Sequence, residues 1–295
     1  MMILFLLLFL SDFLYSQNLI PNPSFEDINV CIKYKKECTP QGWRNVLLRE
    51  FQFPRIKPNH INPKAPRAFK GERIVKMPVY NSGYEFDRTL IQTPLLCELK
   101  KGKSYKLTFH YMVEARTIKD FGIIFSDSIA ILKGVKPLAF RDMPTDGEVR
   151  IKTEEPMVWQ KAELVYTARG GEQAMIIGNF KSDENTKIKI VREKKKREVY
   201  QNRIKLWLDE FSLVPLDGEI PCENIEKNRI EIYRDSIRHT HARIQQVRDF
   251  KSKRKEDSEE NSREIILDSF PELVLDILET ETIVILQPKE RLSTR

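Results

Sequence analysis

Short stretches of alternating apolar and polar residues recur along the first two thirds of the chain. The clearest is Ser104–Val113, where Tyr105, Leu107, Phe109 and Tyr111 alternate with polar residues. A period of two is that of a β-strand with one buried face. Residues 159–167 and 205–214 alternate in the same way. Residues 121–126 are a short apolar run bounded by Asp120 and Asp127, and residues 174–180 follow a turn at 169–172. Repeated short strands with turns between them predict an all-β fold, a single sandwich over residues 17–217.

The last of these stretches is expected to bury one face. The alternation assigns Leu206, Leu208 and Glu210 to one face, and Trp207, Asp209 and Phe211 to the other.

After residue 217 the period changes from two to that of a helix. Apolar and small residues then recur at spacings of three and four, at Ile230, Tyr233, Ile237, Thr240, Ile244 and Val247. This pattern predicts a helical spacer over residues 218–250 that packs on the sandwich or forms a short coiled coil. Residues 251–263 are charged and nearly without apolar residues, which predicts a flexible linker. Residues 264–295 are expected to form a short terminal element.

The first sixteen residues are a separate segment. An apolar run from Met2 to Leu10 precedes Ser11, Asp12 and a polar Gln17. This layout predicts a secretory signal peptide over residues 1–16. A membrane anchor needs roughly 20 apolar residues, and Asp12 interrupts this run. The exported protein is therefore expected in the periplasm or at the outer membrane, with no transmembrane segment after cleavage.

Four cysteines, Cys31, Cys38, Cys97 and Cys222, are an even number in a chain expected to be exported, which favours disulfides. One arrangement closes a small loop between Cys31 and Cys38 and joins Cys97 to Cys222. Three connectivities are formally possible, and free structural thiols remain an alternative.

The chain carries a net charge of +7, and its basic residues are concentrated at 187–197 and 251–255. Such runs are most often solvated loops. Attraction to an acidic envelope polymer is the sharper alternative, whereas the expected location argues against nucleic acid.

Five strings in order resemble a known family. They are Asn18–Glu26, Leu99–Tyr105, Gly122–Asp127, Gly170–Phe180 and Leu208–Leu213. Together they resemble the N-terminal galactose-binding-like (carbohydrate-binding-module-like) jelly-roll of Gram-negative OmpA-family cell-envelope proteins. In that family the first and last strands of the sandwich lie side by side.

The resemblance extends past the sandwich and then stops. Pro221-Cys222 and Ile237-Arg-His239 look like the segment that follows the family's jelly-roll, and Glu281–Leu286 resembles the strand that opens an OmpA-like domain. The rest of that domain has no counterpart in this sequence, so its peptidoglycan-binding residues cannot be carried over. The chain thus also fits a truncated member of this family.

The resemblance further implies a structural calcium ion held by Glu26 and Asp209, with Asp27, Glu72 and Glu210 as possible additional ligands. Calcium takes six to eight oxygen ligands. No other cofactor is expected.

Sugar binding by such a fold needs exposed aromatic rings. Tyr80, Tyr84 and Phe86 surround a loop at Asn81-Ser-Gly83 and are the expected platform. The three tryptophans, Trp43, Trp159 and Trp207, are expected in the core.

No catalytic residues are predicted. The chain has four histidines and lacks GxSxG, HExxH, Walker and GxGxxG motifs. The sequence therefore predicts a non-catalytic envelope binding or adhesion module that recognises a glycan or a protein partner. The alternative is a structural component of an outer-membrane assembly. The oligomeric state is left open.

Overall fold

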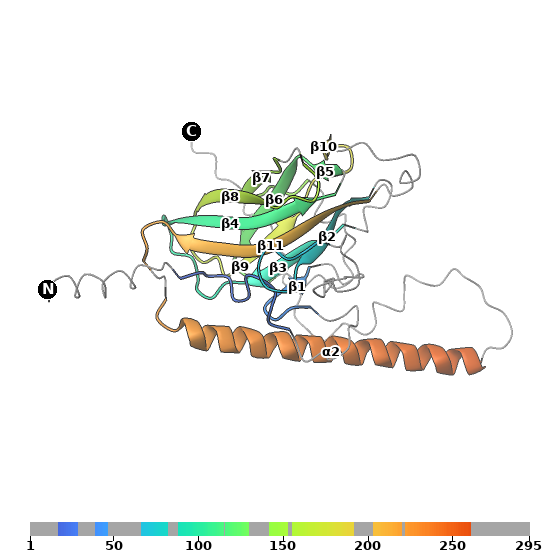
Figure 1. The fold of residues 1–295 in the computed structure, drawn as a ribbon. Coiled ribbons are helices and arrows are strands. Elements are labelled where there is room, and N and C mark those ends of the chain that lie inside the picture. Colours follow the sequence, from blue (N-terminus) through green and yellow to red (C-terminus); the bar gives the residue numbers. More distant parts are fainter. Residues whose placement is uncertain are drawn as a thin grey trace, which may run out of the picture.

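The computed structural model describes residues 17–28, 39–46, 66–81, 88–114, 116–129, 142–152, 155–191, 203–219 and 222–260. These residues form two antiparallel sheets that pack face to face, followed by one long helix (Figure 1). The fold is the all-β jelly-roll sandwich followed by a helix that the sequence predicts.

The first sheet has five strands in the order β1-β3-β9-β6-β7. Their bounds are β1 Arg44–Asn45, β3 Leu90–Pro94, β9 Ala174–Gly178, β6 Asp120–Ser126 and β7 Gly147–Arg150. The second sheet has four strands in the order β2-β11-β4-β8, with bounds β2 Val75–Asn81, β11 Arg203–Pro215, β4 Ser104–Val113 and β8 Gln160–Thr167. A small antiparallel pair of strands, β5 Arg116–Ile118 and β10 Ile188–Ile190, lies at one end of the sandwich.

The core lies between the two sheets. In β4 the alternate residues Tyr105, Leu107, Phe109 and Tyr111 are almost fully buried, as the alternation predicts. Phe109 stacks on Phe211 with 4.9 Å between ring centroids, and Trp43 lies 5.2 Å from the same ring. Burial of such rings is the main favourable contribution to folding a sandwich of this size.

The two ends of the sandwich sequence meet. Leu19 donates its N–H to the carbonyl of Leu213 at 2.8 Å, and Phe211 donates to the carbonyl of Pro23 at 2.9 Å. The Asn18 side chain bonds both the Phe211 carbonyl and the Leu213 N–H. Residues 18–23 therefore lie beside β11, so the first and last described segments of the sandwich are adjacent.

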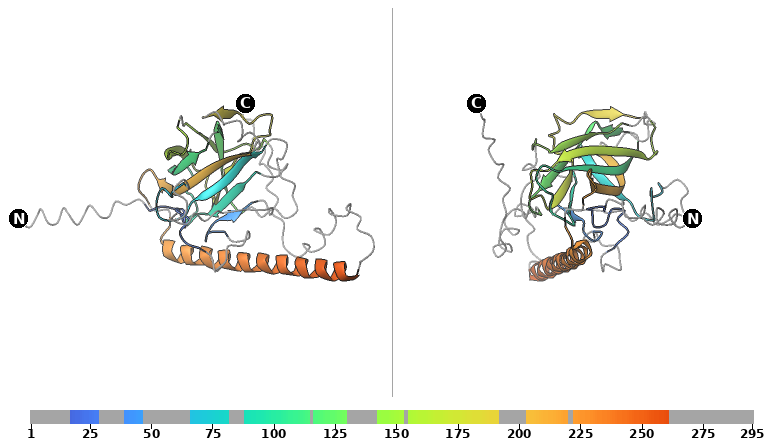
Figure 2. Two further views of the ribbon diagram at one scale, coloured as in Figure 1. Left: turned by 45° about the vertical axis from the view of Figure 1, so that its right-hand side comes forward. Right: turned by 90° about the vertical axis from the view of Figure 1, so that its left-hand side faces the viewer.

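Helix α2, Ile225–Glu260, lies along the sandwich and extends past it (Figures 1 and 2). Residues 251–260, which the sequence assigns to a flexible linker, are its last turns. The docked face agrees with the predicted one in part. Thr240 is buried and Tyr233 is half-buried, as predicted, whereas Ile230 is 57% exposed, and the buried Ile225 and Ser236 lie outside the predicted set. In the described residues no helix has the length and apolar character needed to cross a bilayer.

A disulfide joins the helix segment to the sandwich. Cys97 is bonded to Cys222, as in the predicted pairing. Asn228 adds a hydrogen bond from Nδ2 to the Leu96 carbonyl at 2.7 Å, and Tyr233 donates its hydroxyl to the Pro21 carbonyl at 2.8 Å. Cys31 and Cys38 lie outside the described residues.

Candidate functional site

A loop over residues 66–74 leads into β2 and is held by a buried carboxylate. Asp209, on β11, is fully buried. Its Oδ2 accepts hydrogen bonds from the backbone N–H of Phe69 at 2.8 Å and of Lys70 at 3.0 Å, and its Oδ1 accepts from the Glu210 N–H at 2.8 Å. The register of β11 against β4 shifts between Asp209 and Ser212, so a β-bulge lies beside this anchor.

A second carboxylate holds the other half of the same loop. Glu26 Oε1 accepts from the backbone N–H of both Glu72 and Arg73, each at 2.8 Å. Arg73 in turn donates to the Glu26 carbonyl. Gly71, which lies between the two anchored halves of the loop, has φ +69°, a conformation that glycine adopts without strain. The loop thus wraps around Glu26.

The environment of Asp209 has opposing effects on its pKa. Burial is the largest effect and raises the pKa because it disfavours the charged form, the three N–H donors lower it, and the nearby Glu210 carboxylate raises it. Together these effects raise the pKa of Asp209 to about 7. The Asp209 carboxyl therefore changes protonation near neutral pH.

This donor set does not fit a calcium ion. Calcium requires a shell of oxygen ligands, whereas the oxygens of Glu26 and Asp209 face amide N–H donors and the Arg73 guanidinium. Asp27 accepts from the Tyr233 hydroxyl, and Glu210 pairs with Lys70 at 3.4 Å. Within the described ranges, no group of three or more His, Cys, Asp or Glu side chains is arranged to hold a metal.

The anchored loop places an aromatic ring on the outer face of the four-stranded sheet. Phe69 stacks on His110 of β4, with 3.6 Å between centroids and 12° between planes. Trp159, just before β8, meets Phe69 at 71° with centroids 6.1 Å apart. Trp207 of β11 packs in the same patch with Ile74 and Met112, and Trp159 contacts that group. We call Phe69, His110, Trp159 and Trp207 the outer aromatic cluster.

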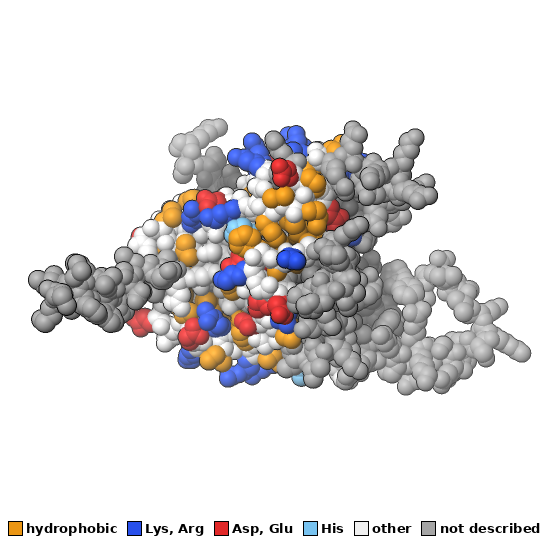
Figure 3. Space-filling model, viewed as in Figure 1, with side chains coloured by type: hydrophobic (Ala, Val, Ile, Leu, Met, Phe, Trp, Pro, Cys, Tyr) orange, Lys and Arg blue, Asp and Glu red, His pale blue; other side chains and the backbone are white. Residues whose placement is uncertain are grey.

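Part of the cluster is open to solvent. Phe69 is 47% exposed and Trp159 is partly exposed, whereas Trp207 is only 5% exposed. An apolar area beside a histidine is visible on this face in Figure 3. Because their planes are far from parallel, Phe69 and Trp159 form a corner with two walls.

The polar groups of the cluster leave hydrogen-bonding capacity unused. Trp207 Nε1 and His110 Nδ1 are buried and have no hydrogen-bond partner. A buried donor without a partner costs about 1–3 kcal/mol. Lys76 Nζ lies 4.2 Å from the Trp207 ring centroid and pairs with Glu114 at 2.8 Å. Burial, then the Lys161 charge, lowers the pKa of His110, so its imidazole is neutral at pH 7.

Only one residue of the predicted platform lies among the described residues, so the platform as a whole stays a prediction. Tyr80 is only 9% exposed and belongs to the main core, with the Arg88 guanidinium 5.4 Å from its ring centroid. Tyr84 and Phe86 lie outside the described residues. Of the three tryptophans expected in the core, Trp43 is fully buried there, whereas Trp159 and Trp207 belong to the outer face.

One signal for the outer cluster was present in the sequence. Trp207 alternates with Leu206 and Leu208, which form the core face, so its ring had to lie outside. Phe69 carried no such signal, because its position depends on the loop and on the two distant carboxylates.

Known proteins offer structural likenesses at low similarity. Neither family models nor curated proteins gave a match to the sequence. The CBM22-1 xylan-binding domain from Paenibacillus barcinonensis Xyn10C is 11% identical, with 68% of this chain and 97% of that chain covered and a TM-score of 0.33. The N-terminal cellulose-binding domain of Cellulomonas fimi β-1,4-glucanase C is 11% identical, with coverages of 69% and 99% and a TM-score of 0.33.

The K1 cleaved adhesin domain of Lys-gingipain from Porphyromonas gingivalis W83 is 12% identical, with coverages of 64% and 94% and a TM-score of 0.33. Sequence identities and TM-scores this low give no information about the ligand of this chain.

Proposed function

We propose that this protein is an exported, non-catalytic glycan-binding module, and that the outer aromatic cluster is its sugar site. The observation that carries the proposal is the exposed corner of Phe69 and Trp159, in a cluster that also holds two buried ring nitrogens without a hydrogen-bond partner. An aromatic surface with a few polar groups is the combination that ligand sites use.

The chemistry of a sugar suits this corner. A pyranose presents C–H groups on its faces, which pack on an aromatic ring, and hydroxyls at its rim, which donate and accept hydrogen bonds. One sugar ring stacked on Phe69 would have Trp159 as a side wall. A rim hydroxyl that reached His110 Nδ1 or Trp207 Nε1 after a small side-chain shift would remove the cost of a buried, unpaired nitrogen.

The site is held in place before a ligand arrives. Asp209 and Glu26 fix the backbone at Phe69 and in the residues that follow it, through four loop N–H bonds. A preformed site loses less entropy on binding, because fewer groups must be ordered.

Export and an envelope location are part of the proposal. The apolar leader of residues 1–16 and the Cys97–Cys222 disulfide support it, since disulfides persist in oxidising compartments. The resemblance to envelope proteins of the OmpA family agrees with this location.

The test is glycan binding by residues 17–295 and by variants of the corner. Titration with soluble neutral polysaccharides (xyloglucan, galactomannan, mixed-linkage β-glucan and β-1,4-galactan) is followed by calorimetry and by tryptophan fluorescence. We expect Phe69→Ala and Trp159→Ala each to weaken binding by about tenfold or more, equivalent to ~1.4 kcal/mol.

Val165→Ala is the matched control. Val165 is 59% exposed on the same outer face of β8, but it lies away from the cluster. It should leave affinity unchanged. No binding to any of the polysaccharides, or equal losses in all three variants, would contradict the proposal and favour a structural role for the sandwich.

A further inference from the structure

A cleft with five basic side chains lies at the end of the sandwich that carries β5 and β10. Its volume is about 1010 Å³, and its basic residues are Lys119, Arg150, Lys152, Lys187 and Lys189. Lys and Arg side chains gather along the upper edge of Figure 3, over β7 and β10. We call this site the basic cleft.

Backbone hydrogen bonds fix the positions of these residues. Lys119 donates its N–H to the Lys187 carbonyl at 2.8 Å, and Ile151 donates to the Lys119 carbonyl at 2.8 Å. The Tyr111 hydroxyl bonds both the N–H of Lys152, at 2.9 Å, and its carbonyl, at 3.0 Å. Four of the five basic residues, all but Arg150, therefore have their backbone positions set by these bonds or by the β5–β10 pairing.

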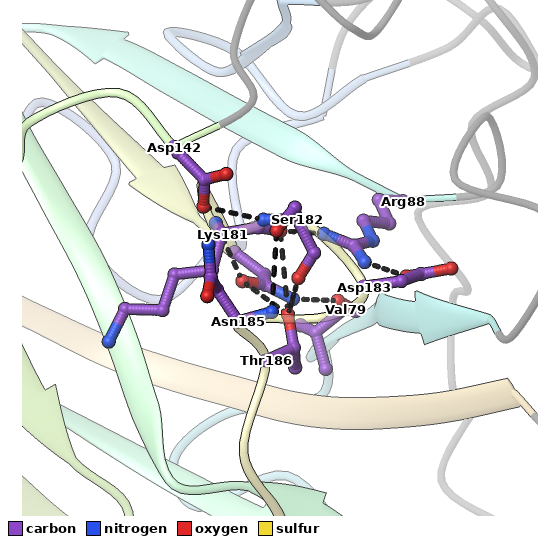
Figure 4. A network of polar contacts seen from close by, with 9 residues as sticks. Val79, Arg88, Asp142, Lys181, Ser182, Asp183, Asn185 and Thr186 are labelled. Carbon is purple, nitrogen blue, oxygen red and sulfur yellow. Dashed lines mark hydrogen bonds and ion pairs between the residues drawn. The ribbon is translucent and has the colours of Figure 1, made fainter.

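The loop that enters β10 is also fixed (Figure 4). Asn179 Nδ2 bonds the Val79 carbonyl and Thr186 Oγ1, each at 3.0 Å. Ser182 N–H donates to Asp142 at 2.9 Å, and Arg88 pairs with Asp183. Lys187 directly follows Thr186 of this network, so its backbone position is fixed by the same hydrogen bonds.

The charges of the cleft are not balanced within the protein. None of the five basic side chains makes an ion pair in the described part of the chain, whereas Lys103 pairs with two carboxylates and Lys106 and Lys161 both pair with Glu163. Among its described lining residues the cleft has two carboxylates, those of Asp120 and Glu155, and Asp120 lies 3.5 Å from Lys181 Nζ. Unpaired cations around a concave surface attract anions.

We propose that the basic cleft binds an anionic polysaccharide, as a second site separate from the outer aromatic cluster. Five cations spread along the cleft match acidic groups that recur along a chain. Asp120, Glu155 and Gln160 line the same space and accept hydrogen bonds from sugar hydroxyls, which a polyphosphate lacks. The lining residues that the structure describes include no aromatic ring, so this part of the cleft does not match single-stranded nucleic acid, whose bases stack on such rings.

The experiment measures binding of residues 17–295 to polygalacturonate (carboxylate groups) and dextran sulfate (sulfate groups) at physiological ionic strength. Neutral dextran and long-chain polyphosphate are the comparison probes. The cleft variant Lys119→Gln/Arg150→Gln/Lys187→Gln replaces exposed side chains, and its melting curve checks the fold. We expect a tenfold or greater loss of affinity for at least one acidic polysaccharide, no binding to dextran, and weaker binding to polyphosphate.

The matched control, Lys100→Gln/Lys101→Gln/Lys227→Gln, removes the same charge from exposed positions outside the cleft. The affinity of this control variant for the acidic polysaccharides should fall less than twofold. Equal losses in the two triple variants would show that the net charge of +7 is responsible, and polyphosphate binding as tight as that of the sugars would exclude the glycan. Neutral-polysaccharide binding at the outer aromatic cluster should be unchanged in the cleft variant, so the two proposals fail separately.

Discussion

Asp209 shows how one residue serves a purpose that its position in the sequence did not reveal. The family resemblance paired it with Glu26 as a calcium ligand, and in the structure both carboxylates lie beside the loop of residues 66–74. The two carboxylates accept backbone N–H bonds, a role for which an acidic side chain alone gives no signal. The two loop amides that bond Asp209 are more than 130 residues away from it in sequence.

The raised pKa of Asp209 predicts that this residue makes stability depend on pH. The carboxyl titrates near 7 in the folded protein and near 3.8 when unfolded. Between these values the folded state holds a proton that the unfolded state has released, so stability falls as pH rises from about 4 to 7 and is level above. One pKa unit is about 1.4 kcal/mol, which gives a span on the order of 4 kcal/mol.

Urea unfolding of the wild type and of Asp209→Asn between pH 4 and 8 measures this. The stability of the wild type relative to Asp209→Asn should decline over that range. Asp217→Asn is the control, because its hydrogen bond with Lys103 lowers the pKa of Asp217 below the usual value. Its effect on stability therefore changes only below about pH 4, and its difference from the wild type should be level between pH 4 and 8. A pH-independent difference for Asp209→Asn would refute the assignment.

At the scale of the elements, alternation predicted the strands that have one buried face. The stretches predicted at 104–113, 159–167 and 205–214 correspond to β4, β8 and β11 within two residues at each end. It did not predict β3, because all five residues Leu90–Pro94 are buried and leave no period. Nor did it predict β10, whose Ile188–Ile190 lies in a basic run that resembles a solvated loop.

The β-bulge in β11 explains the wrong face assigned to two residues. Glu210 has φ +48°, and the ladder shifts between Asp209 and Ser212. One extra residue reverses the faces that follow. Phe211 therefore joins Leu206 and Leu208 in the core, where Glu210 was expected.

The loop that carries Phe69 should depend on Gly71. An added Cβ there would lie 2.3 Å from Glu26 Oε1, and the backbone has φ +69°. Gly71→Ala must strain the backbone and displace the acceptor of two loop N–H groups, so we expect a loss of about 2–3 kcal/mol in unfolding free energy. Gly102→Ala is the control, since Gly102 has φ +77° with nothing within 4 Å of the added Cβ.

Gly102→Ala should cost only the backbone term, about 1 kcal/mol. Denaturant unfolding gives both values, and amide exchange at Glu72 and Arg73 should accelerate in Gly71→Ala alone. Equal losses of unfolding free energy in the two variants, with unchanged amide exchange at Glu72 and Arg73, would mean that Glu26 does not hold the loop.

At the scale of the whole molecule, long-range closure was predictable where a family resemblance supplied it. The pairing of residues 18–26 with 206–213 came from the resemblance, and the bonds between Leu19 and Leu213 confirm it. The docked face of α2 was predictable only in part. Thr240 belongs to the predicted face and is buried, but Ser236, which accepts a hydrogen bond from the Gly42 N–H at 3.3 Å, gives no apolar signal in the sequence.

The Cys97–Cys222 disulfide connects the exit of β3 to the start of α2 and closes a loop of 125 residues. Cross-linking such a loop lowers the entropy of the unfolded chain, an effect of about 3–5 kcal/mol. Cys97→Ala/Cys222→Ala should therefore unfold at a clearly lower denaturant midpoint, while neutral-glycan binding below that midpoint is retained because the outer aromatic cluster lies on the other sheet.

The control is Tyr233→Phe, which removes helix hydrogen bonds to Pro21 and Asp27 but leaves the cross-link. Its unfolding free energy should fall by only about 1–2 kcal/mol. A double variant as stable as the wild type would mean that packing of Ile225 and Ile232 on the sandwich, and not the cross-link, holds the helix and the sandwich together.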